Sequence, residues 1–118
     1  MGTPTPLEAA PPGLTDRDAV YLKREDVHEL GAFKWRGALP TLERFRREGA
    51  TGVVTASTGN HGAATAWAAA RLGLMATVFV PEAASRTKLA HLMRLGCEVV
   101  QTGVDLDEAK DQAVAYAA

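Results

Sequence analysis

Short apolar runs alternate with helix-forming segments three times beyond residue 51, and this alternation limits the fold more than any other feature. The apolar runs have the length of buried strands and lie at residues 52–56, 75–80 and 98–101. The helix-forming segments that follow them lie at residues 60–72, 86–95 and 106–118. Strands that alternate with helices form parallel sheets with right-handed crossovers. The sequence therefore predicts an α/β fold with three layers, a parallel sheet with flanking helices.

Residues that start and stop helices support these boundaries. Ser85 and Asp105 stand where a side chain can cap the start of a helix, and Gly73 and Gly96 stand just beyond the ends of two helices. The last helix reaches Ala118 without a stop residue of this kind. We therefore expect the chain to be the N-terminal part of a longer protein, with a small complete domain as the alternative.

The first 48 residues are less regular. Residues 1–19 are rich in proline and lack periodicity, which indicates an extended lead-in, and residues 20–23 are a short strand candidate. Residues 33–48 carry apolar side chains at helical spacing and therefore predict a helix. Pro40 is expected either to kink this helix or to begin it, since a proline inside a helix removes a hydrogen bond.

Composition and charge exclude several classes of function. The chain has 13 basic and 14 acidic residues, and the basic ones are scattered, so it lacks the clustered charge of a nucleic-acid surface. Its longest apolar stretch, residues 63–70, is too short to cross a bilayer, so we expect no membrane partner. The single cysteine, Cys97, excludes an internal disulfide and fits a reducing cytoplasm. His28 and His91 are not at metal-ligand spacing, so no metal site is predicted.

Lys34 is the first candidate for chemistry, in the run Gly31-Ala32-Phe33-Lys34-Trp35-Arg36-Gly37. An amine attacks a carbonyl group only when it is uncharged. Apolar walls from Phe33 and Trp35, and a positive neighbour at Arg36, would favour the uncharged form. Most lysines lie on protein surfaces, so an ordinary surface lysine at the start of a helix is the alternative.

A second candidate site follows at Ser57-Thr58-Gly59-Asn60-His61-Gly62, between a predicted strand and a predicted helix. The first backbone N–H groups of a helix lack partners, and here they would point to the crevice where open α/β sheets bind ligands. The glycines permit close approach of the backbone, so the segment predicts an anion site, most naturally for a carboxylate. The alternative is an ordinary helix start capped by Thr58 or Asn60. The segment matches neither of the Gly-rich patterns that bind dinucleotides and triphosphates.

The two motifs together resemble the fold-type II, or tryptophan-synthase-like, pyridoxal-phosphate enzymes. Within these enzymes the likeness is to the threonine/serine dehydratase and serine racemase group, and it runs in order and spacing along nearly the whole chain. The segments that carry it are Thr5–Leu7, Tyr21–Asp26, Gly31–Ala38 and Ser57–Gly62.

This resemblance implies a role for each residue of the site. Lys34 would form a Schiff base with pyridoxal 5′-phosphate and then act as acid and base at the substrate's α-carbon, with Phe33 against the cofactor. Asn60 would also hydrogen-bond the ring hydroxyl of the cofactor. The residues that would hold the substrate carboxylate are Ser57, Thr58, Gly59, Asn60 and His61. Thr58 stands where the racemases carry a serine that serves as a second acid and base.

The chain departs from the family pattern in two respects. Ala32 stands where many relatives carry a serine. The Gly-rich loop that cradles the cofactor phosphate, and the residue that partners the pyridine nitrogen, lie further downstream in the family. We therefore expect the 118-residue chain alone to be incomplete for turnover. By the same resemblance, residues 1–48 would be part of the larger domain, and residues 49–118 a smaller α/β domain that is incomplete at its C-terminal end.

Two residues favour the dehydratase and racemase side of the family. Threonine and cysteine synthases usually carry an acidic residue at the position of Trp35 and a threonine at that of His61. The implied activity is a lyase reaction that converts L-threonine or L-serine to a 2-oxo acid and ammonia. The alternatives are a serine or aspartate racemase, a threonine synthase-like enzyme, and a non-catalytic half-fold module. The expected partner is a small amino-acid substrate, and we expect the full-length protein to be a cytoplasmic homo-oligomer.

Overall fold

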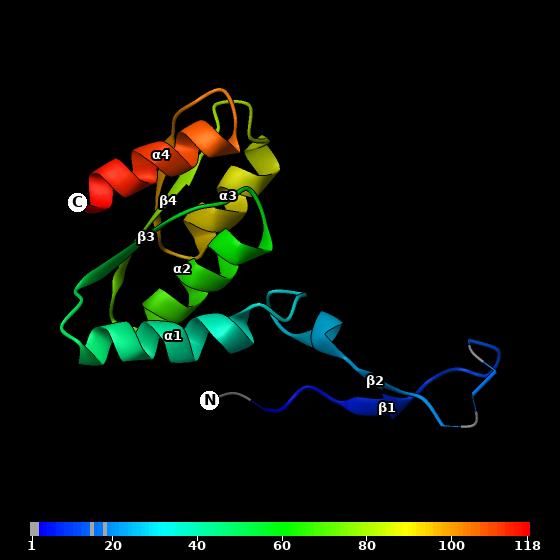
Figure 1. Ribbon diagram of the computed structural model, residues 1–118. Helices are drawn as coiled ribbons and strands as arrows, with labels where there is room; N and C mark the ends of the chain where they lie inside the picture. The colour runs from blue at the N-terminus through cyan, green and yellow to red at the C-terminus, as the bar shows by residue number, and fades with distance from the viewer. Residues whose placement is uncertain (1–2, 15, 18) are drawn as a thin grey trace. The chain divides into compact units, whose positions relative to one another are not determined.

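The computed structural model describes residues 3–14, 16–17 and 19–118. The chain divides into two units, Met1–Phe33 and Lys34–Ala118. This division differs from the domain boundary predicted after residue 48, which concerns the longer protein and stays a prediction. Figure 1 draws both units as a ribbon and labels most of their helices and strands.

A short antiparallel hairpin organises the first unit. Strand β1 (Leu7–Ala9) pairs with strand β2 (Tyr21–Lys23), and the 3-10 helix η1 (Glu25–Val27) follows. The strand predicted at residues 20–23 is confirmed. The lead-in predicted for residues 1–19 contains strand β1, which local periodicity could not reveal, because its partner lies further along the chain. Residues 1, 2, 15 and 18 of this lead-in lie outside the described residues.

Polar side chains tie the start of the first unit to the residues around β2. The hydroxyl of Thr5 donates to Oε1 of Glu25 at 2.8 Å, and Nζ of Lys23 donates to the carbonyl oxygen of Thr5. Arg24 forms an ion pair with Asp26 at 2.7 Å, and its hydrogen bond lowers the pKa of the Asp26 carboxyl. The sequence run that precedes the lysine motif is therefore a hydrogen-bonded structure and not a loose tail.

Helix α1 (Trp35–Arg47) begins the second unit and confirms the helix predicted over residues 33–48. Pro40 lies inside this helix, so it does not begin it; the first helical residue is five positions earlier. Leu42 is buried on α1, which packs on helix α2 (Asn60–Leu72).

A three-stranded parallel sheet forms the centre of the second unit. Its strands, in order across the sheet, are β3 (Gly52–Ala56), β4 (Met75–Val80) and β5 (Glu98–Gln101). Val54 lies opposite Thr77, and Phe79 lies opposite Val100. The remaining helices are α3 (Arg86–Arg94) and α4 (Leu106–Ala117). The order of strands and helices confirms the predicted α/β fold.

Successive residues of the central strand face opposite layers of helices. Val78 faces α2, because a Cβ atom on Gly62 would lie only 3.2 Å from its Cγ1. Phe79 packs with Ala109 and Ala113 of α4. Helix α3 contacts α2 and β5, whereas α4 contacts β3 and β4. The sheet therefore lies between α2 and α3 on one face and α4 on the other (Figure 1), which confirms the predicted three layers.

The predicted caps set the helix boundaries. The hydroxyl oxygen of Ser85 accepts from the N–H of Lys88 at 3.3 Å, and Oδ1 of Asp105 accepts from the N–H of Glu108 at 3.0 Å. Gly73 ends α2 in the left-handed conformation with φ 70°, which glycine adopts without steric cost. None of the helices in the described part of the chain is long and apolar enough to cross a membrane.

Candidate active site

Lys34 lies directly before α1, and its backbone already belongs to the helix. Its φ of −61° and ψ of −21° are helical. Its carbonyl oxygen accepts from the N–H groups of Gly37 at 3.2 Å and Ala38 at 3.1 Å. The side chain of Lys34 is exposed, and that of Phe33 is 63% exposed. The start of α1 therefore sets where the lysine side chain begins and leaves this side chain exposed. The apolar wall that the sequence predicted at Phe33 does not enclose it, because Phe33 is itself largely exposed.

Trp35 connects the lysine motif to α2. Its ring centroid lies 5.6 Å from that of Trp67, at an interplanar angle of 63°. The guanidinium of Arg36 lies 4.5 Å from the centroid of the Trp35 ring. The aromatic residue and the cation that follow the lysine therefore contact each other, and the aromatic residue packs on the helix that begins at the second motif.

The second motif joins the carboxyl end of β3 to the start of α2. Ser57 is 7% exposed; its N–H donates to the carbonyl oxygen of Phe79 at 3.1 Å. Its hydroxyl oxygen accepts from the N–H of Gly59 at 3.2 Å, which closes a tight turn. Gly62 lies above this turn, and a Cβ atom there would meet Cβ of Ser57 at 3.1 Å. A glycine at position 62 therefore allows α2 to begin directly over the end of β3.

The start of α2 carries no side-chain cap. Its N-cap residue is Gly59, so neither Thr58 nor Asn60 caps the helix as the ordinary alternative requires. The first helical hydrogen bond runs from the N–H of Ala63 to the carbonyl oxygen of Gly59 at 3.2 Å. The N–H groups of residues 60–62 therefore have no partner within the helix. Together with the positive end of the helix dipole, they form an arrangement that binds anions.

His61 is oriented by contacts that the sequence motif does not contain. Its Nε2 lies 3.1 Å from Oγ1 of Thr55 on β3, and its carbonyl oxygen accepts from the hydroxyl of Thr65 at 2.9 Å. Thr55 was not among the predicted site residues. Its contact depends on how the strand, turn and helix fold over one another, and no spacing rule marks it in the sequence.

The topology places this turn where open α/β sheets bind ligands. The chain moves from β3 through β4 to β5 with α2 and α3 on one face, and α4 then returns across the opposite face to β3 and β4. Ligands of such sheets bind outside the carboxyl ends of the strands, at the point where the connections change direction. The turn at residues 57–61 leaves the carboxyl end of β3 and so lies at the edge of the sheet where such ligands bind.

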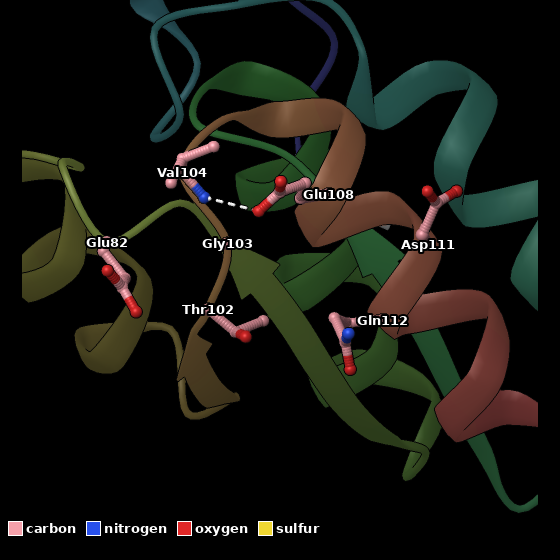
Figure 2. Close-up of a pocket in the computed structure, with 7 residues that line it drawn as sticks. All are labelled: Glu82, Thr102, Gly103, Val104, Glu108, Asp111 and Gln112. Atoms are coloured by element: carbon pink, nitrogen blue, oxygen red, sulfur yellow. Dashed lines mark hydrogen bonds between the residues drawn. The ribbon is translucent and has the colours of Figure 1, made fainter.

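A pocket of about 310 Å³ lies elsewhere along the same edge of the sheet, beyond β4 and β5 (Figure 2). Its lining residues are Glu82, Thr102, Gly103, Val104, Glu108, Asp111 and Gln112. The carboxylate of Glu108 accepts from the N–H of Val104 at 2.9 Å and so stabilises the start of α4. None of the predicted site residues lines this pocket, so we do not assign the site to it.

The described residues fit the aldehyde of pyridoxal 5′-phosphate and a separate anionic group. Lys34 supplies an accessible amine for the aldehyde, and the uncapped start of α2 supplies donors for an anionic oxygen. A Cβ atom on Gly59 would meet no atom within 4 Å, so the space in front of the turn is open to a ligand. Among the residues that the structure describes, no group of three or more His, Cys, Asp and Glu side chains is arranged to hold a metal ion.

Comparisons with known proteins agree with this fit. Residues 1–118 match the family described as pyridoxal-phosphate dependent enzyme. The chain is 45% identical to the L-threonine ammonia-lyase of Geobacter sulfurreducens over 96 residues, which are 80% of this chain and 24% of that protein. The processed form of threonine deaminase isoform 2 from Solanum lycopersicum superimposes with a TM-score of 0.77 and 37% identity, over 82% of this chain and 29% of that one. A pyridoxal 5′-phosphate-dependent aspartate racemase superimposes with a TM-score of 0.82 and 34% identity, over 98% of this chain and 37% of that one.

The chain thus spans about a quarter of the length of the L-threonine ammonia-lyase that it matches. The family match covers the whole chain, and the structural likeness covers both the lysine motif and the α/β unit. The resemblance inferred from the two motifs is therefore confirmed, and the chain belongs to the pyridoxal-phosphate dependent enzyme family of fold type II.

Proposed function

We propose that the protein is a pyridoxal-phosphate-dependent lyase that acts on L-threonine or L-serine. It removes the β-hydroxyl and the amine and releases a 2-oxo acid and ammonia. The observation that carries the proposal is the uncapped start of α2 at the carboxyl end of β3, which suits the carboxylate of an amino acid. The 45% identity to a relative named L-threonine ammonia-lyase supports the choice of substrate.

The turn before α2 would orient the substrate. The N–H groups of residues 60–62 and the side chains of Thr58 and Asn60 would hold the carboxylate. The hydroxyl oxygen of Ser57 accepts from the N–H of Gly59, so Ser57 keeps the turn in shape while its own proton remains available to donate. A carboxylate held in this way fixes the direction of the Cα–H bond, and such orientation is a large part of catalysis.

Lys34 would supply the chemistry at the α-carbon. Its Nζ would hold the cofactor through the aldehyde carbon and, with the substrate in place, would take the proton from the α-carbon. The bound cofactor supplies the electron sink that stabilises the resulting negative charge. The proton that Lys34 takes would leave with the β-hydroxyl as water, and water would hydrolyse the resulting enamine to the 2-oxo acid and ammonia. Phe33 would lie against the cofactor, and Asn60 would hydrogen-bond its ring hydroxyl.

Racemisation is the second candidate activity, and Thr58 is the residue that favours it. Its hydroxyl belongs to the same turn, where a proton donor could return a proton to the α-carbon from the face opposite the lysine. The likeness to an aspartate racemase over 98% of this chain supports this candidate.

Product analysis of the full-length protein separates the two activities. The protein would be loaded with pyridoxal 5′-phosphate and incubated with L-threonine, L-serine or L-aspartate. The lyase proposal predicts equal amounts of 2-oxo acid and ammonia, lost in Lys34→Ala and kept in Lys110→Ala, a control at an exposed lysine of α4. A D-amino acid without ammonia would establish racemisation, and loaded protein that forms neither product would overturn both activities.

We also propose a cytoplasmic location and a homo-oligomeric assembly for the full-length protein. The single cysteine of residues 1–118 supports the first, since this part of the protein cannot form an internal disulfide. Sedimentation of the full-length protein measures the second directly, and a monomer at working concentration would contradict it.

A further inference from the structure

The first turn of α1, which carries Lys34, receives little stabilisation from its own sequence. No side chain caps it, and no acidic residue lies in it. Lys34 and Arg36 place positive charge near the positive end of the helix dipole, which is unfavourable. Gly37 has poor helix propensity. Pro40 has no N–H to donate to the carbonyl oxygen of Arg36. Left to local interactions, this turn would fray.

A tertiary contact opposes this fraying. Trp35 is the first residue of α1, and its ring meets the ring of Trp67 edge to face, the geometry that aromatic pairs prefer. Trp67 is only 8% exposed and lies in the run of buried residues on α2. The guanidinium of Arg71 lies 4.3 Å from the centroid of the Trp67 ring, which further restricts the ring. The start of α1 therefore contacts a buried part of α2.

The same helix carries the turn that would bind the carboxylate. Trp67 lies seven residues after Asn60, which corresponds to about 10 Å along the helix axis. Because α2 is continuous between these residues, whatever fixes the start of α1 to Trp67 also fixes the Lys34 backbone relative to the turn. We propose that Trp67 is a positioning residue that acts through Trp35 to hold the Lys34 backbone at a set distance from the start of α2. The importance of this contact for the reaction of Lys34 rests on the proposed function. The mechanical coupling, by which Trp67 holds the backbone at the start of α1, does not.

Amide hydrogen exchange of the full-length protein tests the mechanical coupling. Trp67→Leu removes the ring, and Trp67→Phe keeps an aromatic edge in its place. Leu42→Ala is the matched control, because Leu42 is buried on α1 two turns beyond Trp35 and on the same face. After correction for global stability, we expect exchange at Gly37 and Ala38 to rise at least about fivefold in Trp67→Leu. The same amides should stay within about twofold of wild type in Trp67→Phe and Leu42→Ala.

Lysine labelling tests what the coupling does for the amine. The full-length protein would be treated with pyridoxal 5′-phosphate, reduced with borohydride and mapped by mass spectrometry, and Lys23, Lys88 and Lys110 would serve as internal references. We expect the labelling of Lys34 relative to these lysines to fall at least about threefold in Trp67→Leu and to recover in Trp67→Phe. Leu42→Ala should leave the ratio unchanged although it also lowers stability, which separates positioning from general destabilisation.

The outcomes that overturn the proposal are distinct from those that overturn the proposed function. Unchanged exchange at Gly37 and Ala38 in Trp67→Leu, or an equal rise in Leu42→Ala, would show that Trp67 does not hold the turn. If Trp67→Leu does not fold, Trp35→Leu removes the same ring contact, and Trp35 is only half-buried. Amide exchange at Gly37 and Ala38 is then measured in that variant. Full-length wild-type protein without preferential labelling at Lys34 would refute the proposed role of the lysine, while the exchange data would still decide the positioning role.

Discussion

Replacing Gly62 by alanine tests how closely α2 packs over the turn of the candidate site. A Cβ atom at this position would lie 3.1 Å from Cβ of Ser57 and 3.2 Å from Cγ1 of Val78. Both distances are shorter than ordinary carbon–carbon contacts of about 3.5–4.0 Å. Ser57 is held by its backbone bond to Phe79 and Val78 is fully buried, so neither can move away easily. The added methyl group must therefore strain the turn, the strand or the helix.

The size of the effect follows from two opposing contributions. Alanine in place of glycine within a helix stabilises it by about 1 kcal/mol. Overpacking of a filled interior costs about 1–3 kcal/mol. The expected net change for Gly62→Ala is therefore a loss of about 0–2 kcal/mol in the free energy of unfolding.

Gly37→Ala is the matched control for this substitution. Gly37 is also helical, but a Cβ atom there would meet no atom within 4 Å, so this variant should be about 1 kcal/mol more stable than wild type. The difference between the two variants removes the helix propensity and isolates the overpacking, about 1–3 kcal/mol. Urea unfolding of both variants measures it. If Gly62→Ala stabilises the chain as much as Gly37→Ala, α2 is not packed on the turn as described.

Two further predictions concern the caps and the cysteine. Asp105→Ala and Ser85→Ala should each lower the free energy of unfolding by about 0.5–2 kcal/mol, because each removes the side-chain acceptor at a helix start. Urea unfolding measures this loss, and unchanged stability would contradict the cap geometry. Burial raises the pKa of the Cys97 thiol, so its contribution to stability should be complete below the ordinary thiol pKa and decrease as the pH rises above it. The thiol should also react more slowly with a disulfide reagent in the folded chain than in urea at the same pH, and equal rates would contradict its burial.

The elements predicted best are those that local signals determine. The second unit has the predicted alternation of strands and helices, because buried parallel strands are continuous apolar runs and their helices start and stop at recognisable residues. Ser85 and Asp105 accept the expected hydrogen bonds, and Gly73 adopts the expected left-handed conformation. At these positions the chemistry of one residue determines the backbone conformation next to it.

The features that the sequence did not reveal depend on residues distant in the chain. Strand β1 exists because β2 pairs with it, and no periodicity marks it. Gly59 and not a polar neighbour is the N-cap of α2, since the hydroxyl of Ser57 is engaged within the turn. Trp67 meets Trp35 only because α1 packs on α2, and no spacing in the sequence marks this contact. The types and order of residues in the sequence are enough to locate the candidate site. The contacts that support it become visible only in the folded structure.

The most direct test of the account is the location of the cofactor on the full-length protein. The protein, loaded with pyridoxal 5′-phosphate, would be reduced with borohydride, digested and analysed by mass spectrometry. The account predicts one adduct per chain, on the peptide that contains Lys34 of the Phe33–Arg36 run. An adduct on a different lysine, with Lys34 unmodified in a fully loaded protein, would contradict it.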